Sequence, residues 1–243
     1  MYVRHPHWSL YVCTSGRIFE TFGIRPKLIP QDKQMELTAL SSIMVNKDSP
    51  KSGRPIVAIG ETGLDDTSKH SIGEQLMIYT EQVLMAARFQ MPLVLHCRGT
   101  HLFRQMYEIL KTVLPMNHPI HWHCINANSD LSLLMELMNT FPNSYIAFNG
   151  SSVSNSDENI QKAFRKWILD LKDLLSHLIL ETDFPFLCPE GLYVHDYNPI
   201  SGIFASAKFI EETARIRGEN ANKLIQLSNS NIRRVYNLSR FDV

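Results

Sequence analysis

Four apolar runs of the chain each carry, or lead into, a side chain that binds metal ions. The runs are short and rich in Ile, Leu and Val, so they predict buried strands. Imidazole nitrogens and carboxylate oxygens together suit Zn²⁺, Mn²⁺ or Mg²⁺. The runs and their polar residues are Ile56–Gly60 with Glu61, Leu93–Cys97 with His96, Ile120–Cys124 with His123, and Leu178–Glu181 with Asp183.

These four side chains occupy equivalent ends of their runs. In a parallel α/β fold, the loops at the carboxyl ends of the strands come together and build the site. A buried carboxylate is costly without a positive partner, so a strand that finishes on Glu181 and Asp183 requires a cation nearby. The sequence therefore predicts a metal site at this edge of the sheet.

Periodicity alone leaves two alternatives open. His121 shares a strand face with His123, and Glu181 shares a face with Asp183, because side chains alternate every two residues. Either member of each pair fits the pattern of a ligand.

The elements that must position these residues follow from alternation along the chain. Two further strands are predicted at Arg17–Ile24 and Tyr145–Phe148, which makes six. Between the strands, apolar residues recur at helical spacing, and Asp157 is predicted to be the N-cap of the helix with the face Ile160–Leu174. This alternation predicts βαβ units and a parallel sheet. The predicted helical faces are Leu76–Ala87, Leu131–Met138, Ile160–Leu174, Ile203–Ile216 and Ala221–Tyr236.

Composition narrows the class of protein. Of 243 residues, 44% are hydrophobic, which is enough for a large core and too many for a disordered chain. Lys plus Arg equals Asp plus Glu at 24 each, so any contact with a polyanion is local. No signal peptide or membrane helix is visible, and the four cysteines are scattered. We expect a soluble, reduced, intracellular protein of the cytoplasm or nucleus, monomeric and without a membrane partner.

Four ordered motifs resemble the TatD-type metal-dependent deoxyribonucleases. The resemblance runs from Phe22 to the C-terminus. The predicted helix between the first two motifs and the closing "NIRRVYNL" also fit the family pattern. The motifs are "AIGETGLDD" at 58–66, "PLVLHCR" at 92–98, "HWHCIN" at 121–126 and "ETDFPFLCP" at 181–189.

The resemblance implies an amidohydrolase-like (β/α)₈ TIM-type barrel that binds one or two divalent cations (Mg²⁺, Mn²⁺ or Zn²⁺). It makes Glu61, His96, His123 and Asp183 the metal ligands, with Asp183 also accepting a proton from the attacking water. His121 then belongs to the surroundings or the core, and Glu181 lies one layer deeper. Arg98 is expected to clamp a phosphate, and its alternative role is an ion pair with a carboxylate.

Two departures from the family pattern concern the start of the chain. The family's first strand carries H-x-H, whereas the only candidate here is His5–His7, where Pro6 removes a backbone donor. The family's G-x-H-P-H loop is "GIRPK", which places Arg25 and Lys27 where histidines are expected. With about six strands visible, we expect a barrel incomplete at its N-terminus. Residues 1–16 would be divergent or poorly ordered, and residues 17–243 would form the hydrolase domain.

The function implied by the resemblance is hydrolysis of DNA phosphodiester bonds, from 3′ ends. The alternative is a catalytically weak or inactive barrel that acts as a binding module. A third hypothesis keeps the metal site but changes the substrate to another phosphoester or an amide, because one barrel hosts many chemistries.

Overall fold

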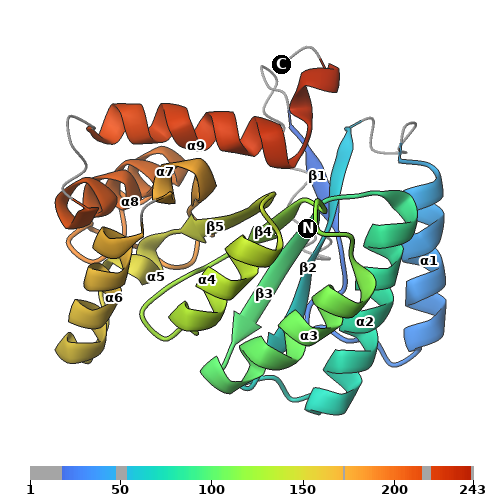
Figure 1. Ribbon diagram of the computed structural model, residues 1–243. Helices are drawn as coiled ribbons and strands as arrows, with labels where there is room; N and C mark the ends of the chain where they lie inside the picture. The colour runs from blue at the N-terminus through green and yellow to red at the C-terminus, as the bar shows by residue number, and fades with distance from the viewer. Residues whose placement is uncertain (1–17, 48–53, 172, 215–219, 242–243) are drawn as a thin grey trace.

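A computed structural model describes residues 18–47, 54–171, 173–214 and 220–241. These residues contain one sheet of six parallel strands in the order β1-β2-β3-β4-β5-β6 (Figure 1). The predicted α/β class with six strands is confirmed. The strands are β1 (Glu20–Phe22), β2 (Ile56–Asp65), β3 (Leu93–Arg98), β4 (Ile120–Trp122), β5 (Ser144–Phe148) and β6 (Leu178–Leu180).

Helices follow the strands, as the alternation predicts. Asp157 is an N-cap, since its carboxylate accepts the backbone N–H groups of Asn159 and Ile160. The predicted helical face that reaches Leu174 is interrupted at Leu171, where the backbone becomes extended. The helices are α1 (Lys33–Val45), α2 (Ile72–Phe89), α3 (Phe103–Val113), α4 (Leu131–Thr140), α5 (Gly150–Val153), α6 (Glu158–Asp170), α7 (Leu174–His177), α8 (Pro199–Ala214) and α9 (Ala221–Val235), with 3₁₀ turns η2 (Thr100–Leu102) and η3 (Leu238–Phe241).

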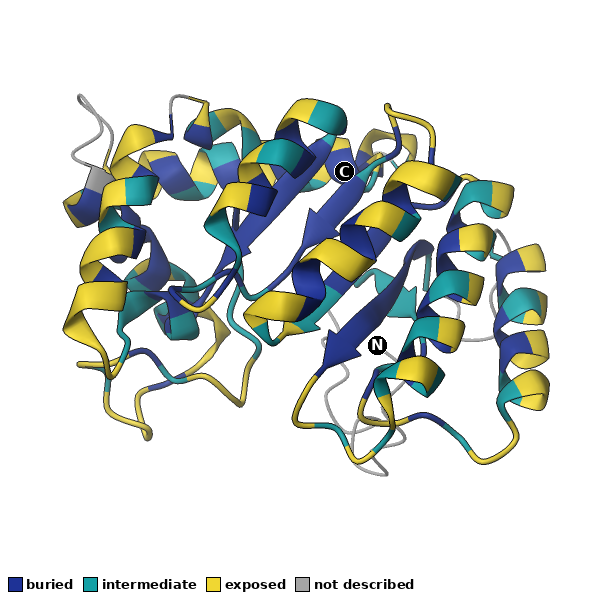
Figure 2. Ribbon diagram, turned by 60° about the horizontal axis from the view of Figure 1, so that its bottom comes forward, coloured by how far each residue is buried: buried dark blue, intermediate teal, exposed yellow. Residues whose placement is uncertain are grey.

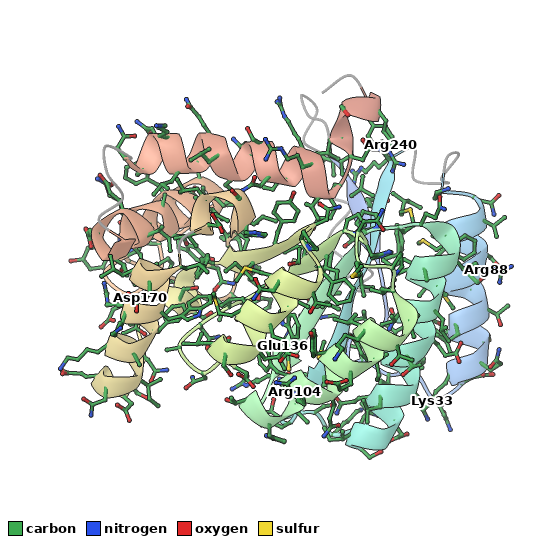
Figure 3. The ribbon with its side chains drawn as sticks, viewed as in Figure 1. Lys33, Arg88, Arg104, Glu136, Asp170 and Arg240 are labelled. Atoms are coloured by element: carbon green, nitrogen blue, oxygen red, sulfur yellow. The ribbon has the colours of Figure 1, made fainter. Side chains whose placement is uncertain are left out.

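The main core lies between the sheet and the helices that cover its outer face. Figure 2 shows buried strands and helices that turn a buried stripe toward them and an exposed stripe toward solvent. Phe103 of α3 stacks on Trp122 of β4, with ring centroids 4.9 Å apart. Such a pair adds about 0.5–1.5 kcal/mol to the free energy of burial. At the surface, Arg104 of α3 reaches Glu136 of α4 at 2.7 Å (Figure 3).

Helix α9 covers the opposite face of the last two strands. Tyr145 and Ala147 point away from the main core and, with Ile179, pack against Val235 of α9. The same helix satisfies backbone groups of β6: the Leu180 N–H donates to the Ser228 hydroxyl at 2.8 Å. The Asn231 amide donates to the Leu175 and Leu178 carbonyls, also at 2.8 Å. Side chains of α9 therefore hold β6 at the edge of the sheet, where no further strand pairs with it among the described residues.

The C-terminal turn then returns to the beginning of the sheet. Phe241 of η3 packs against Phe19 at 5.4 Å, and Arg240 donates to the Ile56 carbonyl at 3.5 Å. Figure 3 places Arg240 beside the start of β2. Residues near the end of the chain therefore tie β6 to β1 and β2.

The predictions about the first sixteen residues, with His5 and His7, lie outside the described residues. The domain boundary at residue 17 stays a prediction. No helix among residues 18–47, 54–171, 173–214 and 220–241 is long and apolar enough to cross a membrane.

Candidate metal centre and its cavity

Two glycines of β2 bring Glu61 against the neighbouring strand. A Cβ atom on Gly60 would lie 2.5 Å from the Val94 carbonyl, and one on Gly63 would lie 1.8 Å from the His96 carbonyl. Both glycines have positive φ, at 138° and 149°, where other residues are strained. The register shifts between Ile59 and Thr62, and pairing with β3 then continues to Asp65. The prediction that β2 ends at Gly60 is therefore wrong, and Glu61 lies at an irregularity inside the strand.

Three of the four predicted ligands converge on one point. His96 Nδ1 lies 3.0 Å from Glu61 Oε1 and 3.1 Å from His123 Nε2, and the His123 nitrogen lies 3.5 Å from the same Glu61 oxygen. Tetrahedral zinc with bonds of 2.0–2.1 Å spaces its ligand atoms about 3.3 Å apart. The three atoms therefore fit one such ion, and we call Glu61, His96 and His123 the ligand cluster.

Each imidazole of the ligand cluster has a carboxylate behind it. His96 Nε2 faces Asp65 Oδ2 at 3.3 Å, and His123 Nδ1 faces Glu181 Oε1 at 3.4 Å. A carboxylate at the far nitrogen keeps the proton there and leaves the near nitrogen free to bind a cation. The two histidines present opposite nitrogens to the cluster, Nδ1 of His96 and Nε2 of His123, and in both rings the carboxylate favours the tautomer that a metal site needs.

The charges of this cluster stabilise one another. Burial alone would raise the pKa of Glu61, but His123 and His96 outweigh it and hold the pKa well below its usual range. Burial would lower the pKa of both histidines, yet the surrounding acidic groups raise it. These groups are Asp65 and Glu61 for His96, and Cys124, Glu61 and Glu181 for His123. Without a cation, protons on the imidazoles balance the carboxylates. A bound cation would displace those protons, because it prefers neutral imidazole.

A second polar group lies directly below the ligand cluster. Glu181 Oε1 accepts the Cys124 N–H at 2.6 Å and the Asn149 amide at 3.1 Å. His121 Nε2 lies 3.6 Å from Glu181 Oε2, and His121 Nδ1 is hydrogen-bonded to the Tyr236 hydroxyl. We call Glu181, His121 and Tyr236 the supporting group. Of the two histidines that share the period-two pattern, His123 lies within the ligand cluster, and His121 contacts Tyr236 at the end of α9.

Asp65 belongs to the site although sequence reasoning did not select it. The carboxylate is buried, accepts from the Thr67 N–H at 2.8 Å and the Thr67 hydroxyl at 2.6 Å, and meets Lys27 Nζ at 3.3 Å. Burial would raise its pKa, but the hydrogen bonds from His96 and Thr67 lower it further than burial raises it. The signal lay in the "GLDD" motif, whose first aspartate is the fourth residue after Glu61.

Asp183 lies at the mouth of the site, outside the tight cluster of three. Its backbone is left-handed, with φ of 54°, and its side chain lines the same cavity as Glu61 and His96. Burial raises the pKa of this carboxyl, and the charge of His123 only partly offsets burial and the repulsion from Glu61 and Glu181. Asp183 is therefore the carboxyl of the site that holds a proton most readily.

The cavity itself has a volume of about 1030 Å³ and a polar wall. Arg98, at the end of β3, is exposed, lines this cavity, and makes no salt bridge with another described residue. Arg25 and Lys27 also line it, and Arg25 Nη2 lies 3.2 Å from both oxygens of Glu61. Serine and asparagine side chains from the loops after β4 and β5 complete the wall.

Fold and site together define an α/β protein with a mixed imidazole–carboxylate centre at the carboxyl end of a parallel sheet. Residues 8–237 match the family described as "TatD related DNase". The chain belongs to this family.

Two relatives by sequence illustrate the extent of the match. The "3'-5' ssDNA/RNA exonuclease TatD" of Yersinia pseudotuberculosis is 29% identical over 196 residues, which cover 75% of this chain and 66% of that protein. The human "3'-5' RNA nuclease TATDN2" is 27% identical over 190 residues, which cover 75% of this chain and 23% of that protein. The chain thus spans just under two thirds of the bacterial relative and about a quarter of the human one.

A solved structure shares the fold. The TatD homologue YjjV of Escherichia coli superposes with a TM-score of 0.74 at 20% sequence identity, covering 96% of this chain and 83% of that one. A phosphotriesterase homology protein of the same organism, in a structure titled as complexed with phosphate in the active site, gives 0.51 at 12% identity over 66% of this chain and 56% of that one. The predicted relation to TIM-type barrels is confirmed at the level of the fold.

Proposed function

We propose that this chain is a metal-dependent nuclease that hydrolyses phosphodiester bonds of DNA from 3′ ends. The observation that carries the proposal is the convergence of Glu61, His96 and His123 on one point beside a polar cavity. Membership of the TatD related DNase family supports the reaction class. The relatives named as 3′–5′ exonucleases on single-stranded DNA and RNA support the polarity and add RNA as a second substrate to test.

Each side chain has a part in the proposed reaction. A divalent cation held by Glu61, His96 and His123 would polarise the phosphodiester and lower the pKa of bound water. Asp183, whose pKa is raised by burial, accepts the proton of the attacking water. Arg98 holds the non-bridging phosphate oxygens through its guanidinium fork. Asp65 and Glu181 keep the two imidazoles oriented from behind.

We further propose one tightly held ion rather than two. The Arg25 guanidinium contacts both oxygens of Glu61 at 3.2 Å, and Lys27 contacts Asp65. These two positive charges lie on the cavity side of the carboxylates, where they reduce the attraction for a second cation. The same contacts favour the rival function, a weak or inactive barrel used as a binding module, because Arg25 competes with the ion for Glu61. A monomeric state and an intracellular location also stay predictions.

Metal analysis and a degradation assay test the proposal together. We expect about one Zn²⁺, Mn²⁺ or Mg²⁺ per chain after dialysis, and shortening of 5′-labelled single-stranded DNA from its 3′ end. His96→Ala should abolish both, whereas His101→Ala, an exposed imidazole on the cavity rim, should keep the metal. Retained binding of DNA with neither metal nor cleavage would support the binding module instead.

Arg98→Leu separates substrate binding from folding. Because Arg98 is exposed and unpaired among the described residues, its loss should lower turnover roughly 10- to 100-fold while metal content and thermal midpoint stay near wild type. A large fall in the thermal midpoint would point to the structural ion pair.

A further inference from the structure

The segment that follows Asp183 exposes aromatic side chains beside the catalytic cavity. Phe186 is 66% exposed and Tyr193 is 72% exposed, with Phe184 at 39%. Asp183 and Leu187, which flank the two phenylalanines, both line the cavity. Single exposed apolar residues are ordinary, but here three aromatic rings that are at least one third exposed lie on one segment that borders the cavity, which suits contact with a ligand.

The backbone that carries these rings is fixed. The Tyr197 hydroxyl lies 2.7 Å from the Thr182 carbonyl and 2.6 Å from the Phe186 carbonyl. The Phe186 N–H donates to the Asp183 carbonyl at 2.9 Å, and the Phe184 ring packs edge-to-face on Tyr197 at 5.3 Å. Because the backbone is already ordered, a ligand that stacks on Phe186 costs little conformational entropy.

Close packing on α5 also fixes the backbone of this segment. A Cβ atom on Gly150, at the start of α5, would lie 1.8 Å from the Leu187 carbonyl. Only glycine lets the two backbones approach this closely. The segment is therefore held against the body of the protein while Phe186 and Tyr193 face outward. Further along, the Tyr193 and His195 rings stack at 5.4 Å and 17°, a second flat and exposed surface.

The chemistry of the neighbouring cavity identifies the kind of ligand. Its wall offers the cationic side chains Arg25, Lys27 and Arg98 together with serine and asparagine hydrogen-bonding groups, which suit a sugar–phosphate backbone. Aromatic rings at its edge suit the faces of unpaired bases, because every base presents a π-face whatever its sequence. Paired bases in a duplex are stacked on one another and leave no face free for a protein ring.

We propose that residues 184–197 form a stacking platform for the bases of a single-stranded nucleic acid whose backbone enters the cavity. This inference rests on the proposed function and assigns the contacts with the bases of the substrate strand to this segment, with little sequence preference. Phe186 and Tyr193 are the platform's main rings, and Phe184 joins them next to Asp183.

Substitutions on the platform test the inference by two measurements on the full chain. One is the affinity for a fluorescein-labelled single-stranded oligonucleotide in the presence of chelator, measured by anisotropy. The other is turnover of bis(p-nitrophenyl) phosphate, a phosphodiester without a base. Phe186→Ala and Tyr193→Ala should each weaken oligonucleotide affinity roughly 5- to 100-fold. That loss should exceed any change in turnover of the small ester.

Two further variants separate stacking from simple burial. Val194→Ala is the matched control, since Val194 is 80% exposed on the same segment but has no ring. It should bind the oligonucleotide like wild type. Phe186→Trp should retain affinity and Phe186→Leu should lose it, because leucine keeps an apolar surface without a flat ring.

Several outcomes would overturn the platform. Equal losses for oligonucleotide and small ester would mean that Phe186 supports the site structurally, and equal affinity for duplex and single strand would exclude base stacking. A dimer in sedimentation that Phe186→Ala dissociates, with oligonucleotide affinity unchanged, would make the surface an interface between copies. If the wild type cleaves nothing but binds the oligonucleotide through these rings, the nuclease proposal fails and the platform stands.

Discussion

The ligand cluster and the supporting group each take one histidine from residues 121–123, where β4 ends, yet their polar atoms are arranged in opposite ways. In the ligand cluster, three acceptor atoms of Glu61, His96 and His123 turn toward one another and toward the cavity. In the supporting group, Glu181 receives the Cys124 N–H and the Asn149 amide, while His121 is bound by Tyr236 below. The ligand cluster leaves acceptor atoms facing one another, whereas the polar atoms of the supporting group have partners within the protein, with His121 Nε2 as the exception.

This difference distinguishes the ligand cluster, which is suited to bind a cation, from the supporting group, which stabilises the fold around it. A buried polar atom is costly unless it has a partner, so a group satisfied within the protein adds order without attracting a ligand. The ligand cluster instead keeps acceptor atoms 3.0–3.5 Å apart, which only protons or a cation can reconcile. Glu181 joins the two, since the same oxygen that receives backbone and amide donors also faces His123.

The largest expected effect comes from replacing, one at a time, the two histidines at the end of β4. His123→Ala should remove the bound metal and lower turnover by more than about 100-fold, because one ligand is lost and Glu181 has no imidazole left to orient. His121→Ala should keep the metal and cost about 1–3 kcal/mol of unfolding free energy, since Tyr236 and Glu181 lose a partner. Metal analysis and chemical denaturation measure the two effects. Comparable metal loss in both variants would contradict the division into ligand and support.

Substituting the carboxylates that face the far nitrogens of the imidazoles should have a smaller effect on metal binding. Glu181→Gln keeps the shape of the side chain but loses the charge that orients His123, so metal affinity should fall roughly 10- to 100-fold. Asp65→Asn, behind His96, is the matched variant on the other ring and should give a loss of the same order. Titration with Zn²⁺ or Mn²⁺ after chelation provides the measurement. Unchanged affinity in both would show that the rings are oriented by packing alone.

Apolar strands that end on metal-binding side chains are a local pattern, which brought Glu61, His96 and either His121 or His123 to attention, and the family resemblance favoured His123. The sequence did not predict the partners that orient them. Glu181 reaches His123 across the intervening strand β5, and Tyr236 reaches His121 from 115 residues away, so both contacts depend on how the sheet is assembled.

The extent of β2 was missed for a related reason. Glu61 sits at an irregularity that positive φ at Gly60 and Gly63 makes possible, and a pattern of apolar residues carries no record of such backbone geometry. Arg25 and Lys27 likewise reach the carboxylates only because the loop after β1 folds back over the cavity. Alternation, length and side-chain type were therefore predictable, whereas contacts between distant loops were not.

The smallest expected effect is on stability and comes from a surface carboxylate, Glu74, whose exposure contrasts with the burial of Glu61 and Glu181. Glu74 caps α2 together with Ser71: the Ser71 N–H donates to Glu74 at 3.2 Å, and the Glu74 N–H donates to the Ser71 hydroxyl at 3.3 Å. Lys33 contacts the same carboxylate at 2.9 Å. The hydrogen bond from Lys33, followed by those from Ser71, lowers the pKa of Glu74 from its usual 4.5 to about 2.

The sign of the resulting pH dependence follows from that direction. A carboxyl whose pKa is lower in the folded state stabilises the fold above pH 4.5, and this contribution disappears as the pH falls from 4.5 toward 2. Glu74→Gln should therefore flatten the acid decline of stability slightly in that window, as measured by urea unfolding at several pH values. Glu190→Gln, an exposed carboxylate without an ion pair among the described residues, should leave the decline as it is. Because Glu74 is open to solvent, salt should weaken the contribution of the Lys33–Glu74 ion pair to stability. The buried contacts of Glu181 should respond far less to salt. An equally weak salt response at Glu74 and Glu181 would contradict the contrast between the exposed cap and the buried supporting group.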